Sequence, residues 1–548
     1  MITRYCCYLL GCLCILVAGP WTFAQDFDLQ LGPEYKDESN TWPPDILGSD
    51  ANSYYVFQSG FSRVIPMTNL TRERLYLRKF NRQLTPTHTE EIRLKNGRKS
   101  EDAEFAVMLK GNLFLFSSFS DWTNRSVSLY TRKVDTEQLA IPERGTDLTT
   151  VSFDGYPKDK AVSFNYQLSR DSSKMLLYYQ LPNKPDAPER FKIHLLTEDL
   201  TQLWEQEFEL PYEEELFRVG QFRVDNEGQV YVLGREYFEK PKLRRKGEPN
   251  YQYKLLLLRP GDRVPEEMTL NLDGKFLVDM QIGILRDRNV ICAGVYAEEK
   301  PQFIKGVYSF VLDAAHLEML RESSQELSLD LFADEEEENQ KKKDKPKSKR
   351  QEKKEEKRAK RAFINYEFDD MILRSDGGVM LVAEASFMTS SSYYVSNGTN
   401  GGSWQTRTIF HHNDLIGVQM APDGNIERAT RIPKQQRTSY SNYLLSYALA
   451  VTGSKVRFIF NDNIKNLALE PGNAAETYVP SSMGKAKQVI AMVTLNYDGT
   501  YKRKALVSTK EAEQFAVPRA SIQTNSREII LVFQKRKKRR LARVLFTD

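Results

Sequence analysis

The stretch LRSDGGVMLVAEASF, residues 373–387, places an Asp-Gly-Gly turn directly before an almost unbroken apolar run. Such a turn followed by such a run is typical of one half of a β-hairpin. A polar turn that leads into a mostly apolar run occurs eight times in the 548-residue chain, and this recurrence predicts a repeat array. The eight runs begin at Ser53, Asn112, Lys174, Gln229, Asn289, Gly378, Lys455 and Glu528.

Strand-like segments flank each apolar run. A shorter segment precedes every run, another follows it, and seven of the units continue into a fourth, more polar segment. A blade of a β-propeller needs four antiparallel strands, and its second strand is apolar on both sides because neighbouring blades cover both faces. The sequence therefore predicts an all-β fold, a β-propeller of eight four-stranded blades, as a single domain over residues 25–548. Two alternatives stay open: seven blades, if the short segment 45–49 does not begin a full blade, and a pair of β-sandwiches.

The two ends of the chain complement each other. The eighth unit stops after its third strand, LARVLFTD at 541–548, which would leave an exposed sheet edge. The segment DFDLQLG, from Asp26, precedes the first unit as a strand without a partner. We expect this N-terminal strand to complete the last blade and close the ring.

Three turn-and-strand patterns carry a resemblance to known proteins: VDNEGQVYVLG at 224–234, LRSDGGVMLVAE at 373–384 and APDGNIERATRIP at 421–433. They resemble the secreted bacterial β-propeller-like repeat proteins, an uncharacterised branch of the WD40/YVTN-like superfamily. The resemblance covers nearly the whole chain after residue 24, but it is one of pattern, since the Gly-His and Trp-Asp signatures of WD40 repeats are absent. It implies a fold and no activity.

Residues 1–24 are predicted to be a secretory signal peptide. They contain one arginine, an apolar core over about residues 5–18, and Thr-Phe-Ala before a cleavage site after Ala24. The core is shorter than the roughly 20 residues that a membrane-spanning helix needs, and no later stretch approaches that length. We expect an exported protein without a transmembrane segment that is periplasmic, outer-membrane-associated or extracellular; lipidation at Cys12 is the alternative to plain cleavage. After cleavage Cys292 is the remaining cysteine, and we expect a buried thiol and no internal disulfide.

The charges are unevenly distributed. The net charge of +4 is too small to imply a nucleic-acid partner. Residues 334–361 hold thirteen Lys/Arg and nine Asp/Glu without a large apolar side chain, so 327–361 is predicted to be a disordered or solvated-helical insert between blades 5 and 6. Two further basic clusters, 240–246 and 535–540, would emerge on the same face and form a positive surface for an anionic partner. The residues assigned to this surface are Lys240, Lys242, Arg244, Arg245, Lys535, Arg536, Lys537 and Lys538.

One face of the predicted propeller is the better candidate for ligand contact. Connections from second to third strands and between blades share that face, and the long segments 236–250, 387–410 and 461–488 fall there. The segment MTSSSYYVSNGTNGGSWQTRT, predicted as a loop, carries Tyr393, Tyr394 and Trp404 among Ser, Asn and Gly. This mixture suits stacking on sugar rings or gripping a peptide, whereas the alternative is that the aromatic rings pack the loop onto its own blade.

Motifs that carry catalytic chemistry are not found. Nucleophile elbows, His-Glu-x-x-His helices, P-loops and Cys-x-x-Cys pairs are absent from the sequence. The closest constellation is His411 with His412, but adjacent residues of an extended strand point to opposite faces and do not hold one ion without a bulge. The sequence predicts no metal and no cofactor.

Two functions follow as hypotheses. The first is an exported, envelope-associated binding or scaffold protein, monomeric, that contacts an envelope protein or glycan on the long-loop face. The alternative is an enzyme that acts on envelope polysaccharide or peptide through the central channel, where polar residues of first strands converge. Channel carboxylates about 5 to 10 Å apart would favour the enzyme. The channel residues named for it are Asp279, Asp369, Asp370 and Arg519.

Overall fold

The computed structural model describes residues 26–37, 41–63, 71–97, 99–153, 162–181, 187–239, 249–298, 304–327, 366–396, 402–439, 442–469, 475–480 and 487–547. The predicted signal peptide lies outside the described residues, as does the predicted insert except for Leu327. Both assignments therefore stay predictions.

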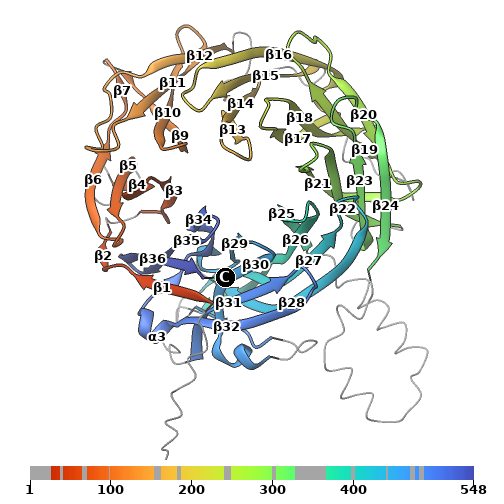
Figure 1. Ribbon diagram of the computed structural model, residues 1–548. Helices are drawn as coiled ribbons and strands as arrows, with labels where there is room; N and C mark the ends of the chain where they lie inside the picture. The colour runs from red at the N-terminus through yellow and green to blue at the C-terminus, as the bar shows by residue number, and fades with distance from the viewer. Residues whose placement is uncertain are drawn as a thin grey trace, which may run out of the picture.

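Antiparallel sheets follow one another along the described chain (Figure 1). The first three four-stranded sheets are β3 (Asp45–Ser49), β4 (Ser53–Arg63), β5 (Thr71–Asn81), β6 (Pro86–Ile92); β9 (Asp102–Leu109), β10 (Asn112–Asp121), β11 (Ser126–Val134), β12 (Thr146–Ser152); and β13 (Asn165–Leu168), β14 (Lys174–Gln180), β15 (Pro188–Thr197), β16 (Gln202–Glu213). The next two are β17 (Phe217–Val224), β18 (Val230–Tyr237), β19 (Tyr251–Leu258), β20 (Glu266–Leu270); and β21 (Phe276–Ile284), β22 (Val290–Ala297), β23 (Ile304–Leu312), β24 (Met319–Glu326).

Three sheets complete the series. Two of them have four strands: β25 (Tyr366–Leu373), β26 (Val379–Ser396), β27 (Gly402–Met420), β28 (Ile426–Thr438); and β29 (Ala448–Thr452), β30 (Lys455–Asn463), β31 (Gln488–Asn496), β32 (Tyr501–Ser508). The last joins both ends of the chain: β33 (Phe515–Ala516), β34 (Ile522–Asn525), β35 (Glu528–Lys535), β36 (Lys538–Phe546), β1 (Phe27–Leu31) and β2 (Tyr35–Lys36). A small hairpin of β7 (Lys95–Asn96) and β8 (Lys99–Ser100) stands apart.

These sheets are arranged in a ring, with the first strand of each nearest the centre and the last strand at the rim (Figure 1). Neighbouring inner strands contact each other, as β13, β17, β21 and β25 do in succession, and as β29, β34, β3 and β9 do. Four-stranded antiparallel sheets that radiate from a common centre are the architecture of a β-propeller. The fold class predicted from the sequence is all-β, and the described chain bears this out.

The second strand of each sheet is the strand that the apolar runs predicted. Every residue of β22 is buried, for example, because sheets cover both of its faces. The buried apolar side chains gather into clusters between neighbouring sheets: Tyr231 on β18 packs in one cluster with Phe310 on β23. The last sheet packs in the same way against the first, through Ile530 and Tyr54.

The N-terminal strand pairs where the sequence predicted. β1 lies antiparallel to β36, with Phe27 opposite Phe546 and Leu31 opposite Ala542. The chain then runs to Asp37, whose buried carboxylate pairs with the guanidinium of Arg78 at 2.8 Å and with that of Arg539. Because Arg78 belongs to β5 and Arg539 to β36, this carboxylate joins the first and last sheets.

Two details differ from the sequence-based expectation. The strand-like segment expected before the last apolar run is split into β33 and β34 by a short 3-10 helix, Pro518–Ala520. Pro518 has no backbone N–H to donate, so it interrupts the ladder. The segment 387–410 was predicted to be a loop, but its described residues continue the strands β26 and β27.

Helical structure is scarce in the described residues. It consists of the one-turn α3 (Thr509–Ala512) and the 3-10 helices η2 (Asn442–Leu444), η3 (Ile464–Ala468) and η5 (Pro518–Ala520). None of the helices in the described ranges has the length and apolar character needed to cross a bilayer. Cys292 on β22 is a free, buried thiol, as predicted, and burial raises its pKa.

Candidate functional site

Strands β26 and β27 extend beyond their neighbours and form a ribbon. β25 pairs with β26 only as far as Ala385, and β28 pairs with β27 only as far as Phe410. Beyond these residues the two long strands pair with each other, up to Ser396 opposite Gly402. In the described structure residues 386–396 and 402–409 therefore make a two-stranded extension of the sheet, which we call the aromatic arm.

One face of the aromatic arm carries large exposed side chains. Tyr394 and Trp404 are directly opposite each other, and their rings meet edge to face with centroids 5.6 Å apart. Trp404 is 73% exposed, Tyr394 is 53% exposed, and Met388 on the same face is 66% exposed. Tyr393 points to the other face, where its hydroxyl donates to Gln405 Oε1 at 3.2 Å, and it is 46% exposed. These aromatic rings do not pack onto their own sheet, so the packing alternative is disfavoured.

Hydroxyl groups line the face between Met388 and the Tyr394–Trp404 pair. Two cross-strand pairs of hydroxyls lie within hydrogen-bond distance, Ser390 with Thr408 at 3.2 Å and Ser392 with Thr406 at 3.0 Å. Arg407 is the only charged residue in the arm's sequence. The arm thus presents a nearly neutral surface of aromatic rings, one thioether and hydroxyls.

The base of the arm is irregular. Pairing of β26 with β27 shifts register between Glu384 and Ser386, and pairing of β27 with β28 shifts between Asn413 and Leu415. Such bulges bend strands and redirect side chains. Here the charged side chain of Glu384 is directed into the protein, where it is only 1% exposed.

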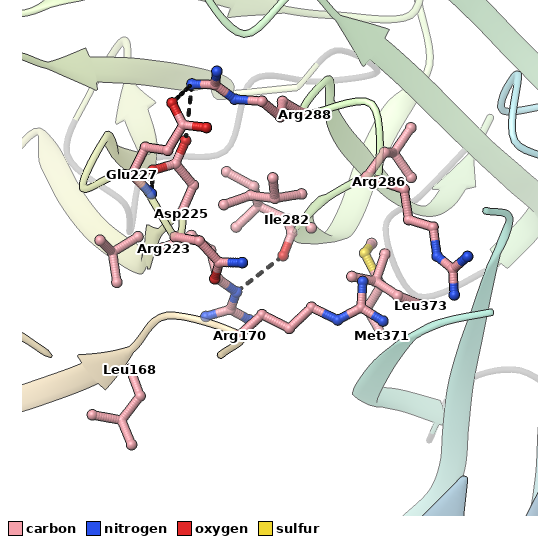
Figure 2. A pocket seen from close by; sticks show the side chains of 15 residues that line it. Leu168, Arg170, Arg223, Asp225, Glu227, Ile282, Arg286, Arg288, Met371 and Leu373 are labelled. Atoms are coloured by element: carbon pink, nitrogen blue, oxygen red, sulfur yellow. Dashed lines mark hydrogen bonds and ion pairs between the residues drawn. The ribbon is translucent and has the colours of Figure 1, made fainter. Parts of the chain in front are cut away.

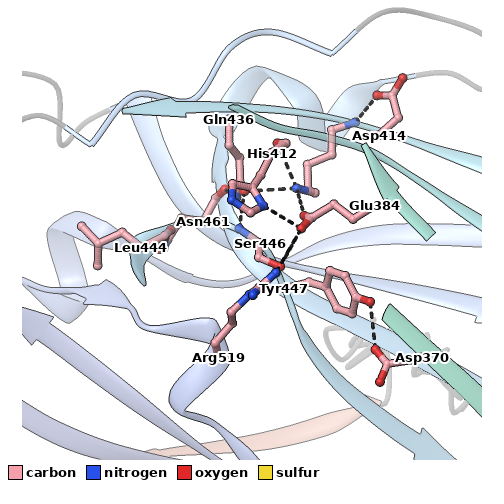
Figure 3. Close-up of polar contacts among 11 residues, drawn as sticks. Asp370, Glu384, His412, Asp414, Gln436, Leu444, Ser446, Tyr447, Asn461 and Arg519 are labelled. Atoms are coloured by element: carbon pink, nitrogen blue, oxygen red, sulfur yellow. Dashed lines mark hydrogen bonds and ion pairs between the residues drawn. The ribbon is translucent and has the colours of Figure 1, made fainter. Parts of the chain in front are cut away.

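Buried polar groups from three strands and the segment before β29 meet at Glu384, and we call Glu384, His412, Lys434, Gln436 and Ser446 the Glu384 cluster (Figure 3). Oε1 of Glu384 accepts from Lys434 Nζ at 2.6 Å. Oε2 accepts from His412 Nδ1 at 2.7 Å and from Ser446 Oγ at 2.8 Å. Lys434 Nζ also donates to the backbone oxygen of His412 and to Gln436 Oε1, so all three ammonium hydrogens have acceptors.

The cluster continues into the next two sheets. Gln436 Nε2 donates to the backbone oxygen of Asn461 on β30 at 2.8 Å. The side chain of Asn461 in turn donates to the backbone oxygen of Ala516 on β33 and accepts from its N–H. The arm's base is therefore tied by buried hydrogen bonds to the sheets that follow it.

Glu384 is held ionised. Burial alone would raise the pKa of its carboxyl group, but the positive charge of Lys434 and the hydrogen bond from His412 outweigh burial and lower the pKa to about 2. The exposed guanidinium of Arg519 adds positive charge 3.8 Å from Oε2. Both carboxylate oxygens are already occupied by donors of the protein.

The presence of serine, histidine and a carboxylate does not make a nucleophile here. In a catalytic triad the histidine lies between the hydroxyl and the acid, so that it takes the hydroxyl proton. Here Ser446 and His412 both donate to the same oxygen of Glu384. The arrangement orients and stabilises the base of the arm and does not activate Ser446.

The predicted channel residues are only partly brought together. Asp370 on β25 accepts from the hydroxyl of Tyr447 at 2.9 Å, and burial raises its pKa. Arg519 reaches Glu384 from η5, whereas Asp369 is exposed on β25. Asp279 lies on the neighbouring β21 and accepts from the N–H of Met280.

The two histidines face opposite sides of β27. His412 belongs to the Glu384 cluster, while the ring of His411 stacks on Phe387 at 4.5 Å and lies 3.0 Å from Thr389 Oγ1. Burial and the nearby charge of Arg437 lower the pKa of His411. Over the described ranges no group of three or more His, Cys, Asp or Glu is placed to hold a metal ion.

The predicted basic surface is only partly described. Lys240, Lys242, Arg244 and Arg245 lie outside the described residues. Residues 535–540 span the tight turn between β35 and β36 and the start of β36: Lys535 and Lys538 end the ladder, and Arg536 and Lys537 are exposed between them. Lys538 pairs with Glu34, and the neighbouring Arg539 is buried against Asp37, so two charges of this cluster are already neutralised.

Of the Glu384 cluster, only His412 is among the candidate residues predicted from the sequence; Glu384, Lys434, Gln436 and Ser446 are not. The cluster's one local signal was a carboxylate, Glu384, inside an otherwise apolar second strand, because a charge at such a position must find a partner. Lys434 and Ser446 carry no comparable signal, since they lie in polar segments that resemble surface strands and turns.

Comparison with known proteins adds little beyond the fold. No model of a known protein family matches the chain, and no curated protein matches it. Among solved structures, the chain is similar to the WD40 domain of SCAP from fission yeast, with 9% identity over 95% of this chain and 99% of that chain and a TM-score of 0.35. It is also similar to the β-propeller domain of the Trilobed protease from Pyrococcus furiosus, with 9% identity over 84% and 97% and a TM-score of 0.31. Likeness at this level says nothing about activity, and the bacterial branch named from the sequence patterns stays a prediction.

Proposed function

We propose that this protein is an exported β-propeller that serves as a binding or scaffold module and contacts a protein partner through the aromatic arm. The observation that carries the proposal is the exposure of Trp404, Tyr394 and Met388 on one face of a ribbon that extends past its own sheet. Tryptophan and tyrosine dominate the binding energy of protein interfaces, and methionine is enriched in them.

The backbone of the arm favours a polypeptide over a glycan as the partner. In the described structure the outer edges of residues 386–396 and 402–409 have no neighbouring strand, so their outward backbone groups are available to an added strand. A sugar would use the rings and hydroxyls of the arm but leave these edges open. The near absence of charge favours a partner segment that is itself neutral.

The Glu384 cluster supports this role by holding the base of the arm. A two-stranded ribbon is only marginally stable by itself in water. Buried hydrogen bonds from Lys434, His412 and Ser446 to Glu384 fix both strands where they leave the sheet. A base held in one conformation reduces the entropy that is lost when the arm binds.

The experiment is photocrosslinking in cells of the source organism. A photoreactive phenylalanine analogue is placed at Trp404, and a matched control places it at Leu203, an exposed apolar residue on another sheet. We expect a protein adduct at Trp404 and none at Leu203. With the partner purified, Trp404→Ala should weaken binding by about tenfold or more, as for a central interface aromatic residue.

Two results would contradict this proposal. One is an adduct pattern that is the same from both positions. The other is binding of the purified protein to neutral glycans that is lost in Trp404→Ala, which would assign the arm to sugar stacking instead.

Export and envelope location are part of the proposal and rest on residues 1–24. Cleavage after Ala24 would leave Gln25 as the first residue of the mature chain. N-terminal mass spectrometry of the protein recovered from the envelope or medium is the test. A full-length N-terminus in the cytoplasmic fraction would contradict export, and a lipid on Cys12 would select the lipidation alternative.

We also infer that the ring has eight blades and that β1 closes it. The inference is supported by clusters of apolar side chains between successive sheets, including the one that joins the last sheet to the first, and by the pairing of β1 with β36. Deletion of 26–32 exposes the edge of β36 and should lower the melting temperature sharply and promote aggregation. Deletion of 334–361, which lacks large apolar side chains, is the control and should change stability by less than about 1 kcal/mol. If the 26–32 deletion variant had the same melting temperature as the parent protein, the inference that β1 closes the ring would be wrong.

A further inference from the structure

A pocket of about 480 Å³ lies near the centre of the ring, between turns and inner strands of four successive sheets (Figure 2). It is lined by the turn after β13, the ends of β17 and β21 with their turns, and the strand β25. Successive strands run in opposite directions, so turns from first to second strands lie at the end of the sheet opposite to turns from second to third strands. The pocket therefore opens on the face opposite to the aromatic arm.

Four arginines line this arginine pocket, against two carboxylates. The arginines are Arg170, Arg223, Arg286 and Arg288, and the carboxylates are Asp225 and Glu227. Both carboxylates are engaged by the same guanidinium, because Arg288 lies 2.8 Å from Glu227 and 3.7 Å from Asp225. The charges of the other three arginines are left without a carboxylate in the described pocket.

Arg223 is held in place by neutral acceptors. Its Nε donates to the backbone oxygen of Ile282 at 3.1 Å, and its terminal nitrogens donate to the backbone oxygen of Phe222 and to Gln221 Oε1. A guanidinium has five N–H groups, so two remain for a ligand. Burial lowers the pKa of Arg223, as expected for a guanidinium that has carbonyl partners but no carboxylate.

Arg170 and Arg286 are exposed at the pocket, on the turns that follow β13 and β21. The acids next to them in sequence are occupied within their own turns: Asp171 accepts from Ser169 Oγ and from a backbone N–H, and Asp287 accepts from Asn289. Neither aspartate forms an ion pair in the described structure with the arginine beside it. The two guanidinium groups therefore keep their capacity for an anion.

The remaining wall of the described pocket is mostly apolar, with Asn226 as its one polar side chain. Side chains of Leu168, Ile282 and Met371 line the pocket with the arginines, from β13, β21 and β25 respectively. Pockets of a few hundred Å³ with apolar walls and a few placed polar groups are typical of small-ligand sites. This composition fits a ligand that has both an apolar body and an anionic group.

We propose that the arginine pocket binds a small organic anion, with an apolar body against the β21 and β25 side chains and a carboxylate, phosphate or sulfate group against Arg170, Arg223 and Arg286. Guanidinium groups bind such oxyanions through paired N–H donors. The aromatic arm lies on the opposite face of the ring and takes no part in this site.

The sequence contains a signal for this site that is not one of the common catalytic motifs. Four successive units place an arginine at or just before the turn into the apolar run: Arg170, Arg223, Arg286 and Arg374. The fourth is not free for a ligand, because Arg374 is buried and pairs with Asp376 and Glu427. The pocket thus forms where three successive arginines lack such partners.

The test uses calorimetric titration of the full-length protein with phenyl phosphate, phenyl sulfate and phenylacetate, and with inorganic phosphate and phenol as partial probes. We expect at least one aryl anion to bind more tightly than both inorganic phosphate and phenol, and the tightest of the three identifies the anionic group. Binding should weaken when the salt concentration is raised from about 0.05 M to about 0.5 M.

Substitutions locate the site. The double variant Arg170→Gln/Arg286→Gln should bind the aryl anion about tenfold or more weakly than the wild type. Each substitution removes a charged hydrogen-bond donor from an exposed position. Arg527→Gln is the matched control: it removes an exposed arginine from the equivalent turn of the last sheet, which does not line the pocket. It should leave the dissociation constant within about twofold.

Three results would overturn the proposal. The first is no binding of any aryl anion. The second is aryl-anion binding that is equal in the wild type and the double variant. The third is inorganic phosphate that binds as tightly as phenyl phosphate, since the apolar wall would then contribute nothing.

Discussion

Two groups of charged side chains in this protein differ in how far their charges are paired within the protein. In the Glu384 cluster, the carboxylate and the ammonium of Lys434 are buried, and their hydrogen-bonding atoms are used within the protein. In the arginine pocket, arginines outnumber carboxylates, and Arg170 and Arg286 are exposed without a carboxylate partner in the described structure. The hydrogen-bonding groups of the first cluster are satisfied within the protein, whereas the second group retains guanidinium N–H donors that we propose bind an anion.

This difference indicates which charged side chains contribute to stability and which are available to a ligand. Removing one partner of a buried ion pair is strongly destabilising, because it leaves the other charge unpaired in a low-dielectric interior. An exposed arginine without a carboxylate adds little to stability but attracts an anion. We therefore expect substitutions in the Glu384 cluster to lower the free energy of unfolding much more than substitutions of the exposed arginines. This comparison needs no ligand.

The largest effect is expected for Glu384→Ala. The substitution leaves Lys434 buried without its carboxylate, so the free energy of unfolding should fall by about 3 to 5 kcal/mol. Urea denaturation measures this loss, with Glu322→Ala on the exposed outer strand β24 as the control that should change stability by less than about 0.5 kcal/mol. Equal, small losses in both variants would show that the Glu384 cluster is not a stabilising element.

The pH dependence should distinguish the cluster from the pocket. The pKa of Glu384 in the folded protein is lowered to about 2, below that of an unfolded glutamate. Its contribution is therefore present above about pH 5 and is lost as the pH falls toward 2, amounting to about 3 kcal/mol. The stability difference between wild type and Glu384→Gln should narrow over this range. A difference that stays constant from pH 7 to pH 3 would mean that Glu384 has an ordinary pKa.

Tyr447→Phe should lower the free energy of unfolding by an amount between those expected for the Glu384 cluster and for the exposed arginines. It removes the hydroxyl that donates to Asp370, a carboxyl group whose pKa burial already raises. We expect a loss of about 1 kcal/mol, as for one hydrogen bond to a partly buried group. Tyr394→Phe on the exposed aromatic arm is the control. In a chain of this length a loss of about 1 kcal/mol lowers the melting temperature by only about 1 °C, so urea denaturation is the measurement that should separate the two variants.

The smallest effect is expected for Arg170→Gln combined with Arg286→Gln. These side chains are exposed and have no ion pair within the described ranges, so the free energy of unfolding should change by less than about 0.5 kcal/mol. A loss of more than about 2 kcal/mol in urea denaturation would mean that the two arginines are structural, and the contrast with the Glu384 cluster would disappear.

The aromatic arm shows why part of the candidate site was misjudged. Ser, Asn and Gly around Tyr393 and Trp404 are typical of a loop, so 387–410 was predicted to be one. The register of β26 with β27 shows cross-strand pairs such as Tyr394 with Trp404, which stabilise a ribbon although no adjacent strand covers it. Such pairing depends on residues brought opposite each other, and composition alone does not reveal it.

The sequence by itself determined the all-β class, the second strand of each sheet and the pairing of the N-terminal strand with the last one. Turn chemistry and apolar runs are local, and a strand covered on both faces must be apolar wherever it occurs. Only the tertiary structure decided which charges are paired. Arg170, Arg223 and Arg286 come from three separate sheets, and Glu384 meets Lys434 on another strand of its own sheet and Ser446 on the segment before β29. Whether a charge is neutralised depends on neighbours that the packing of the sheets brings together, and the linear sequence does not specify that distance.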